Sequence, residues 1–327
     1  MKKIPVNVVI PAVAAVVALG AVAFATALPR HPPGAERRAI ADADRIRTDI
    51  LSRIEHDGLE RTYADLKNER KDDQALHGDA HIFGELAYKK EGIAAIRYCD
   101  NAMTFGCYHG LIVRALVTEG LDALPKIDAA CKAAHGDDDT GCRHGIGHGL
   151  VEFFGPKDLG SALDRCASIQ RPGLLGCAQG AFMDYSNAAA DDPSLVDRKD
   201  LDQPCTSVAP PYRAACYFEQ PYFWMLRADL GSAAAMDRCA ALADPALKES
   251  CLLGFGRATA ELGRYDMVAI DRECARLRAD DRIGCLAGAR WLFAATKKAR
   301  PWPGDGLPAK DAASCSARSK AISDVGQ

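Results

Sequence analysis

Two stretches of the chain carry histidine and glutamate side chains at spacings that suit metal binding. Both read His-Gly-x-x-His-x-x-x-Glu, and their ligand-type residues are His77, His81 and Glu85 in the first and His144, His148 and Glu152 in the second. On an α-helix, residues four apart lie about 6 Å along the axis and about 40° around it, so each triple shares one face. Two histidines one turn apart can bind one metal ion. The spacing therefore predicts a metal site.

A third histidine occupies the same position relative to a preceding cysteine as one of these histidines does. His109 follows Cys107 just as His144 follows Cys142. If such units stack in register, five histidines and two glutamates face one groove. Imidazole and carboxylate ligands suit Zn, Fe, Mn or Cu, and their number suffices for two ions. A single ion shared by His77 and His144 is harder to build, because helices one unit apart are separated by about 10 Å.

The same residues also allow a structural interpretation. The Gly-x-His-Gly pattern could serve packing and hydrogen bonding, and either glutamate could be solvated or could orient a ligand. The His-x-x-x-His-x-x-x-Glu triple occurs twice, however, and the regular spacing of the cysteines independently indicates that the two stretches are equivalent positions of a repeat. This recurrence favours metal binding. Neighbouring residues that could contact a substrate or support the ligands are Asp79, Tyr108, Arg114, Asp184 and Tyr185.

The elements that must position these histidines form a repeat marked by cysteine pairs. The pairs are Cys99 with Cys107, Cys131 with Cys142, Cys166 with Cys177, Cys205 with Cys216, Cys239 with Cys251 and Cys274 with Cys285, and Cys315 is left over. The second members recur at steps of 35, 35, 39, 35 and 34 residues. A fixed period of this length indicates an internal repeat. No Cys-x-x-Cys occurs, so zinc ribbons and thioredoxin-type chemistry are unsupported.

Each unit is predicted to be two helices, as in residues 121–134 and 141–154. The first cysteine lies near the end of one helix and the second near the start of the next, so a disulfide would close the hairpin. Such a ring contributes roughly 3 kcal/mol. Disulfides between neighbouring repeats are the alternative, because spacing does not fix connectivity. A glycine follows most second cysteines by three residues and predicts close helix packing.

The predicted fold is all-α, a solenoid of about six to seven helical hairpins of about 35 residues. This period resembles the tetratricopeptide class of repeats in architecture. The Trp, Leu-Gly, Tyr and Ala-Phe-Pro positions of that motif do not occur, so the resemblance implies a fold and no functional residue. All eight histidines lie at or before residue 148. Within the repeat domain, 37–320, residues 37–190 are therefore assigned to the site and 191–320 to packing and capping.

The N-terminus is predicted to be a targeting segment. Lys2 and Lys3 precede an apolar run from Val8 to Leu28. Residues 1–28 fit both a signal peptide and an uncleaved membrane anchor, and 29–36 fit a linker. Residues 39–70 read as an amphipathic helical lead-in. The 13 cysteines indicate an oxidising, extracytoplasmic compartment such as the periplasm or cell surface.

The composition excludes some functions and leaves others open. The chain has 327 residues, 48% of them hydrophobic, and a net charge of -3, so nucleic acid is not an expected partner. The function we expect is an exported metalloenzyme, either a hydrolase or an oxidoreductase. The alternatives are a metal-binding protein without catalysis and a scaffold of the cell envelope that binds a peptide or another envelope protein.

Overall fold

The computed structural model describes residues 35–69, 73–136, 140–295 and 309–324. These residues form helices and turns, and none of them lies in a strand, which confirms the all-α prediction. The predicted targeting segment and residues 29–34 of the linker lie outside the described residues. Residues 35 and 36 already belong to the first described helix. Within these ranges, no helix has the length and apolarity that crossing a bilayer would require.

The helices form a stack and a set of connecting elements. The stacked ones are α2 (Ala35–Lys67), α3 (Asp73–Glu91), α4 (Gly106–Glu119), α6 (Thr140–Phe154), α8 (Cys177–Ala188), α9 (Arg213–Leu226), α11 (Pro245–Leu262), α13 (Ala279–Ala295) and α14 (Ala309–Asp324). The connecting ones are η1 (Gly92–Tyr98), η2 (Ala102–Phe105), η3 (Gly120–Ala123), α5 (Leu124–His135), η4 (Pro156–Asp158), α7 (Leu159–Ala167), η5 (Pro193–Leu195), η6 (Pro210–Tyr212), α10 (Ser232–Ala241) and α12 (Met267–Cys274). Helix α8 begins at Cys177, directly after Gly176, whose φ of 87° is not helical.

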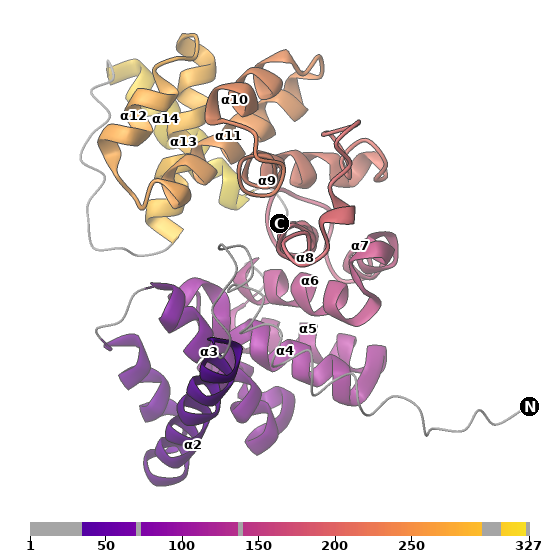
Figure 1. Ribbon diagram of the computed structural model, residues 1–327, viewed down its shortest axis with the longest axis vertical. Helices are drawn as coiled ribbons and strands as arrows, with labels where there is room; N and C mark the ends of the chain where they lie inside the picture. The colour runs from indigo at the N-terminus through magenta and orange to yellow at the C-terminus, as the bar shows by residue number, and fades with distance from the viewer. Residues whose placement is uncertain (1–34, 70–72, 137–139, 296–308, 325–327) are drawn as a thin grey trace, which may run out of the picture.

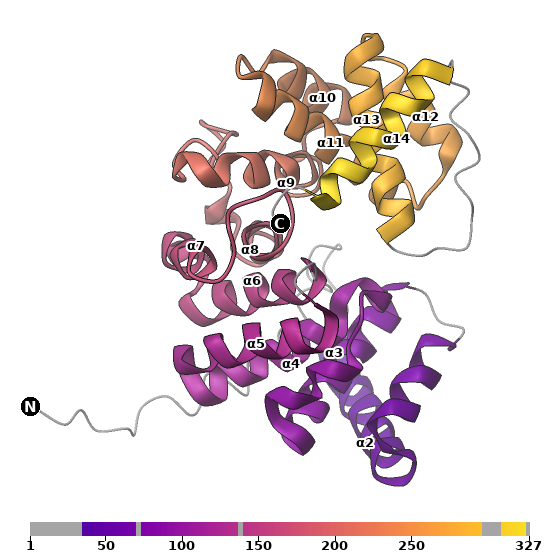
Figure 2. The same ribbon diagram turned by 180° about the vertical axis from the view of Figure 1, so that it is seen from behind.

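The stacked helices pack in chain order. Helices α3, α4, α6, α8, α9, α11 and α13 each contact the next one along the chain. The ribbon climbs from α2 and α3 at the bottom, through α6 and α8, to the C-terminal helices at the top (Figure 1). Seen from behind, α14 crosses α13 at the upper end (Figure 2). Three neighbouring members of this stack, α3, α4 and α6, carry the histidine motifs side by side.

Six disulfides join the cysteine pairs that the period defines. Their Cα–Cα distances are 5.3–5.8 Å, and each lies within one predicted hairpin rather than between neighbours. The bonds join Cys99 to Cys107, Cys131 to Cys142, Cys166 to Cys177, Cys205 to Cys216, Cys239 to Cys251, and Cys274 to Cys285. The remaining cysteine, Cys315, is buried and belongs to none of them. Six such pairs suggest an oxidising, extracytoplasmic location.

The helical hairpin is complete in only four of the six disulfide-bonded units. There the disulfide joins two α-helices, and the second half-cystines of these four units are Cys142, Cys177, Cys251 and Cys285. In the other two units the second half-cystine still lies in an α-helix, Cys107 in α4 and Cys216 in α9. The first half-cystine of these two units lies outside any α-helix, because Cys99 follows the short η1 and Cys205 lies in the turns before α9. The prediction of two helices in every unit is therefore too regular at these two places.

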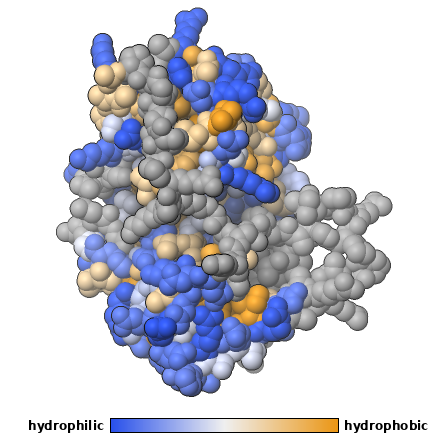
Figure 3. Space-filling view, turned by 90° about the vertical axis from the view of Figure 1, so that its left-hand side faces the viewer, coloured by the Kyte–Doolittle hydropathy of each residue, from blue (hydrophilic) through white to orange (hydrophobic). Residues whose placement is uncertain are grey.

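Helix α2 packs against the core through one apolar face, as the amphipathic pattern of residues 39–70 predicted. Its buried residues include Ile50, Ile54, Leu59, Tyr63 and Leu66, each at most 3% exposed. They join one hydrophobic core that continues to Ile322 and contains the half-cystines. On the face shown in Figure 3, hydrophilic residues cover most of the lower part and hydrophobic ones form separate patches. Scattered exposed hydrophobic residues are usual and need no partner.

Glycines let neighbouring helices approach closely, as the recurrent glycine predicted. A Cβ atom on Gly180 of α8 would lie more than 1 Å inside ordinary contact with the His144 carbonyl oxygen on α6. A Cβ on Gly147 of α6 would clash equally with the carbonyl oxygen of Cys177. Helices α3 and α4 make the same reciprocal contact through Gly84 and Gly110. The histidine-bearing backbones are therefore held close by residues without side chains.

Candidate metal centre

Five histidines from three neighbouring helices of the stack converge at one place. Helix α3 supplies His77 and His81, α4 supplies His109, and α6 supplies His144 and His148. They form two groups of three that share His109, and within each group the ligand nitrogens all lie within 4.8 Å of one another. His109, His144 and His148 are buried, whereas His77 and His81 are half-buried.

The first group contains His77, His81 and His109. The Nε2 atom of His81 lies 3.1 Å from Nε2 of His77 and 3.1 Å from Nδ1 of His109. An ion bound at 2.0–2.1 Å to two imidazole nitrogens in tetrahedral geometry separates them by about 3.3 Å. The three nitrogens are thus close to the spacing that one ion requires.

The second group contains His109, His144 and His148. The Nε2 atoms of His144 and His148 lie 3.1 Å apart. The His109 ring packs against the His148 ring with centroids 4.0 Å apart and lies 5.4 Å from the His144 ring. Nε2 of His109 is buried and has no hydrogen-bond partner. Such an atom loses the hydrogen bond that it would make in water, unless a ligand replaces it.

Hydrogen bonds on the far side of three rings fix which nitrogen faces the centre. Nδ1 of His77 is 2.9 Å from the Met103 carbonyl oxygen, Nδ1 of His144 is 2.5 Å from Oε1 of Gln179, and Nδ1 of His148 is 3.0 Å from Oδ1 of Asp184. The carbonyl oxygens of Met103 and Gln179 accept, and so does the Asp184 carboxyl when it is ionised, so each Nδ1 donates and carries the ring proton. Each Nε2 therefore presents a lone pair to the centre.

Two rings in this tautomer place their Nε2 lone pairs opposite each other, and a cation between the two atoms would satisfy both. A proton could serve, but burial lowers the pKa of His144 well below its ordinary value, and the charge of His148 lowers it further. Burial also lowers the pKa of His148 to about 3, with a further contribution from His77. Both rings are therefore neutral near pH 7. A metal ion bound by the two lone pairs satisfies them without protonating either ring.

A buried chain of polar side chains supports His144 from the C-terminal half. Nε2 of Gln179 donates to Oε1 of Glu219 at 2.5 Å, which turns the Gln179 oxygen toward His144. Nη1 of Arg257 lies 2.5 Å from the same Glu219 oxygen. These three residues, on α8, α9 and α11, are 2–4% exposed. Burial raises the pKa of the Glu219 carboxyl, and Arg257 opposes that shift.

A short loop of unusual backbone supports His77. Met103, Thr104 and Phe105 in η2 have φ values of 51°, 53° and 64°, in the left-handed region that residues with a Cβ seldom adopt. This turn directs the Met103 carbonyl to His77, and the Phe105 ring lies 4.9 Å from the His144 ring. Costly backbone of this kind persists where its surroundings hold it and concentrates at functional sites.

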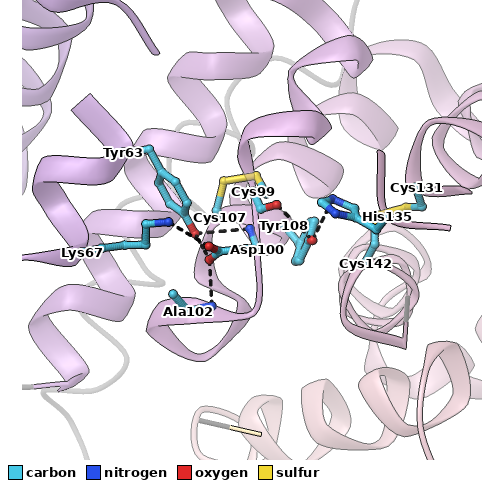
Figure 4. Close-up of a disulfide and its surroundings, with 10 residues drawn as sticks. All are labelled: Tyr63, Lys67, Cys99, Asp100, Ala102, Cys107, Tyr108, Cys131, His135 and Cys142. Atoms are coloured by element: carbon cyan, nitrogen blue, oxygen red, sulfur yellow. Dashed lines mark hydrogen bonds and ion pairs between the residues drawn. A yellow bond between two sulfur atoms is a disulfide. The ribbon is translucent and has the colours of Figure 1, made fainter. Parts of the chain in front are cut away.

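Side chains from α2 hold the start of this loop (Figure 4). The Asp100 carboxylate accepts hydrogen bonds from the Tyr63 hydroxyl at 2.9 Å, from Nζ of Lys67 at 2.8 Å and from the Ala102 amide at 2.9 Å. The Cys99–Cys107 disulfide joins the same loop to α4, two residues before His109. The loop is thereby tied both to the lead-in helix and to the helix that carries a ligand.

The two glutamates of the motifs lie outside both histidine groups. Glu85 is paired with Nη2 of Arg47 at 2.6 Å and with Nζ of Lys89 at 3.0 Å. Glu152 is exposed and lies near Asp184, the partner of His148. Burial raises the pKa of the Asp184 carboxyl above its ordinary value. Among the described residues, the close groups consist of histidines alone.

Two tyrosines suggested as neighbours of the site serve the fold instead. The Tyr108 hydroxyl donates to the Cys99 carbonyl oxygen at 3.1 Å and lies 2.9 Å from Nε2 of His135 (Figure 4). The Tyr185 hydroxyl donates to the Leu195 carbonyl oxygen at 2.8 Å.

The sequence interpretation did not identify the supporting residues Met103, Glu219 and Arg257. One signal was present, because Glu219 replaces the glycine that follows most second cysteines. A second signal lies at Gln179, which stands two residues after Cys177 just as His144 stands two residues after Cys142. Comparison with protein-family models, curated proteins and solved structures finds no match for this chain.

Proposed function

We propose that this protein binds transition-metal ions at the five-histidine centre and acts as a metalloenzyme. The observation that carries the proposal is the pair of Nε2 atoms of His144 and His148, which lie 3.1 Å apart. Outer hydrogen bonds hold both rings in this orientation, an arrangement typical of metal-binding histidines. A neutral cluster without metal would orient at least one ring nitrogen as a donor to its neighbour.

The ligand set favours some metals over others. The close groups offer nitrogen only, which suits Zn, Cu and Fe, whereas Mn is favoured by carboxylates. Three nitrogens leave a fourth position of a tetrahedral ion for water or substrate. The group with half-buried His77 and His81 is the more accessible one. An ion held there would activate water for hydrolysis or bind dioxygen for oxidation.

The proposal extends to the architecture and the location of the protein. We infer a solenoid of six or seven hairpins, supported by packing in chain order and by one disulfide in each of six units. We also propose export by the N-terminal segment 1–28, either as a cleaved signal peptide or as an anchor that holds the domain at a membrane. The six disulfides support an extracytoplasmic location.

Metal content tests the proposed function. The full chain, produced with its disulfides formed, is dialysed against Zn²⁺ or Cu²⁺ and its bound metal is measured by mass spectrometry. We expect His144→Ala and His148→Ala to lose bound metal while keeping their helical circular dichroism. His56→Ala is the matched control, because this side chain is 86% exposed on α2. Full metal occupancy in both centre variants would refute metal binding at this place.

A second measurement separates catalysis from simple metal binding. Azide is added to the Co²⁺-loaded protein, and the visible absorption of the ion is recorded. An open coordination position takes up azide and shifts the spectrum, as the metalloenzyme requires. An unchanged spectrum in a fully loaded protein would mean that the site is saturated, and the protein would then be a metal carrier or a structural metalloprotein.

A further inference from the structure

We propose that the centre holds two metal ions and that the His109 ring bridges them, with Nδ1 bound to one ion and Nε2 to the other. This inference rests on the proposed function, because it concerns the same histidines. It assigns His77, His81 and His109 to the first ion and His109, His144 and His148 to the second. His109 is the one histidine common to both groups.

The first half of the bridge follows from the position of Nδ1. This atom lies 3.1 Å from Nε2 of His81, which itself lies 3.1 Å from Nε2 of His77. An outer hydrogen bond to Met103 directs the lone pair of His77 to the same point. The first ion therefore uses Nδ1 of His109 and leaves the other nitrogen of that ring available.

The second half follows from the surroundings of Nε2. That atom is buried without a hydrogen-bond partner, which is costly for a polar atom inside a protein. The His109 ring lies against His148, whose Nε2 faces Nε2 of His144. A second ion bound to these two nitrogens gives Nε2 of His109 the partner that the protein does not supply.

The proposed bridge is consistent in charge and in geometry with the five histidines. Both nitrogens of one imidazole can bind metal only when the ring N–H proton leaves, and here it passes to solvent as the second ion binds. Ions on the two nitrogens of one ring lie about 6 Å apart. Each ion then has three nitrogen ligands, and five histidines provide both sets by sharing one ring.

The two ions would differ in access. The first lies beside half-buried His77 and His81, whereas the second is enclosed by three buried histidines. The first ion is therefore the one that meets water or substrate. The enclosed ion, through the shared ring, holds His109 in place and changes the electron density at the first ion.

Variants that remove one ligand at a time test the bridge on the full, disulfide-bonded chain loaded with Cu²⁺. We expect two ions per wild-type chain, and one ion in His77→Ala and in His144→Ala. Removing the shared ligand in His109→Ala weakens both ions by at least about ten-fold. The control His56→Ala keeps two ions. If His109→Ala loses one ion and retains the other at full affinity, the bridge is wrong.

Electron paramagnetic resonance of the wild-type protein gives a test that needs no variant. Two Cu²⁺ ions joined by one imidazole ring couple magnetically, so the signal at low temperature is much weaker than the copper content predicts. A signal that accounts for all the copper would overturn the bridge. A wild-type chain that binds one ion overturns the inference but leaves the proposed function intact, and a chain that binds none overturns both.

Discussion

Replacing Gly180 with alanine is predicted to weaken metal binding without changing any ligand. This glycine lies on α8, against the carbonyl oxygen of His144 on α6, and a Cβ there would fall more than 1 Å inside the ordinary contact distance of 3.4 Å. The atom that it meets is backbone, which cannot rotate away. Helices α6 and α8 must therefore separate by on the order of 1 Å, while metal–ligand distances tolerate about 0.2 Å.

The expected magnitudes follow from the same contact. Overpacking typically costs 1–3 kcal/mol, and the gain of about 1 kcal/mol in helix propensity offsets part of this. We expect a net loss of about 1 kcal/mol and a melting temperature lower by about 3 °C. Separation of α6 from α8 also pulls His144 from Gln179, so metal affinity should fall by on the order of 10–100-fold.

Two further glycines provide matched controls. Gly288 makes the same contact with the Leu253 carbonyl oxygen, between α11 and α13, so Gly288→Ala should lose similar stability and keep its metal affinity. Gly160 on α7 has no neighbour within 4 Å of an added Cβ, so Gly160→Ala should be neutral or stabilising by up to about 1 kcal/mol. Thermal unfolding and competitive metal titration measure both quantities. If Gly180→Ala loses stability but binds metal like the wild type, helix spacing does not position His144.

Three other predictions concern single residues. Asp184→Asn replaces the carboxylate that accepts from Nδ1 of His148, so metal affinity measured by titration should fall at least about ten-fold while helical content is unchanged. Burial opposes ionisation of Glu85, but Arg47 and Lys89 outweigh it and lower its pKa below 4.5. The ion pair therefore stabilises the fold above about pH 4.5 by roughly 1 kcal/mol, and the stability difference between wild type and Glu85→Gln should disappear as the pH falls through the lowered pKa. Cys315 is buried, so a thiol reagent should label no cysteine in the native protein and one after unfolding without reductant; more than one label would contradict the disulfide pairing.

The sequence predicted the helices and the disulfides because both depend on local spacing. The cysteine period defined six units, and each disulfide lies within its own unit, although only four of the six are complete helical hairpins. The four-residue spacing also predicted that His144 and His148 share one helix face, and their Nε2 atoms lie 3.1 Å apart. Local periodicity specifies which side chains share a face, whatever the rest of the chain does.

The parts that the sequence did not predict depend on contacts between distant residues. Four-residue spacing puts Glu85 on the histidine face, but Arg47 on α2 pairs with it. The support of His144 reaches Arg257, more than a hundred positions along the chain, through Gln179 and Glu219. Residues after 190 were assigned to packing and capping, yet Glu219 and Arg257 take part in this chain of contacts.

The disulfides have a consequence for the order in which the protein matures. Cys107 and Cys142 each precede a histidine of the centre by two residues, and a reduced chain would offer 13 thiols in addition to its imidazoles. Thiolates compete strongly for zinc and for monovalent copper. If the centre binds metal as we propose, we therefore expect the 12 paired sulfur atoms to be oxidised first, so that these thiolates no longer compete with the imidazoles for the ion.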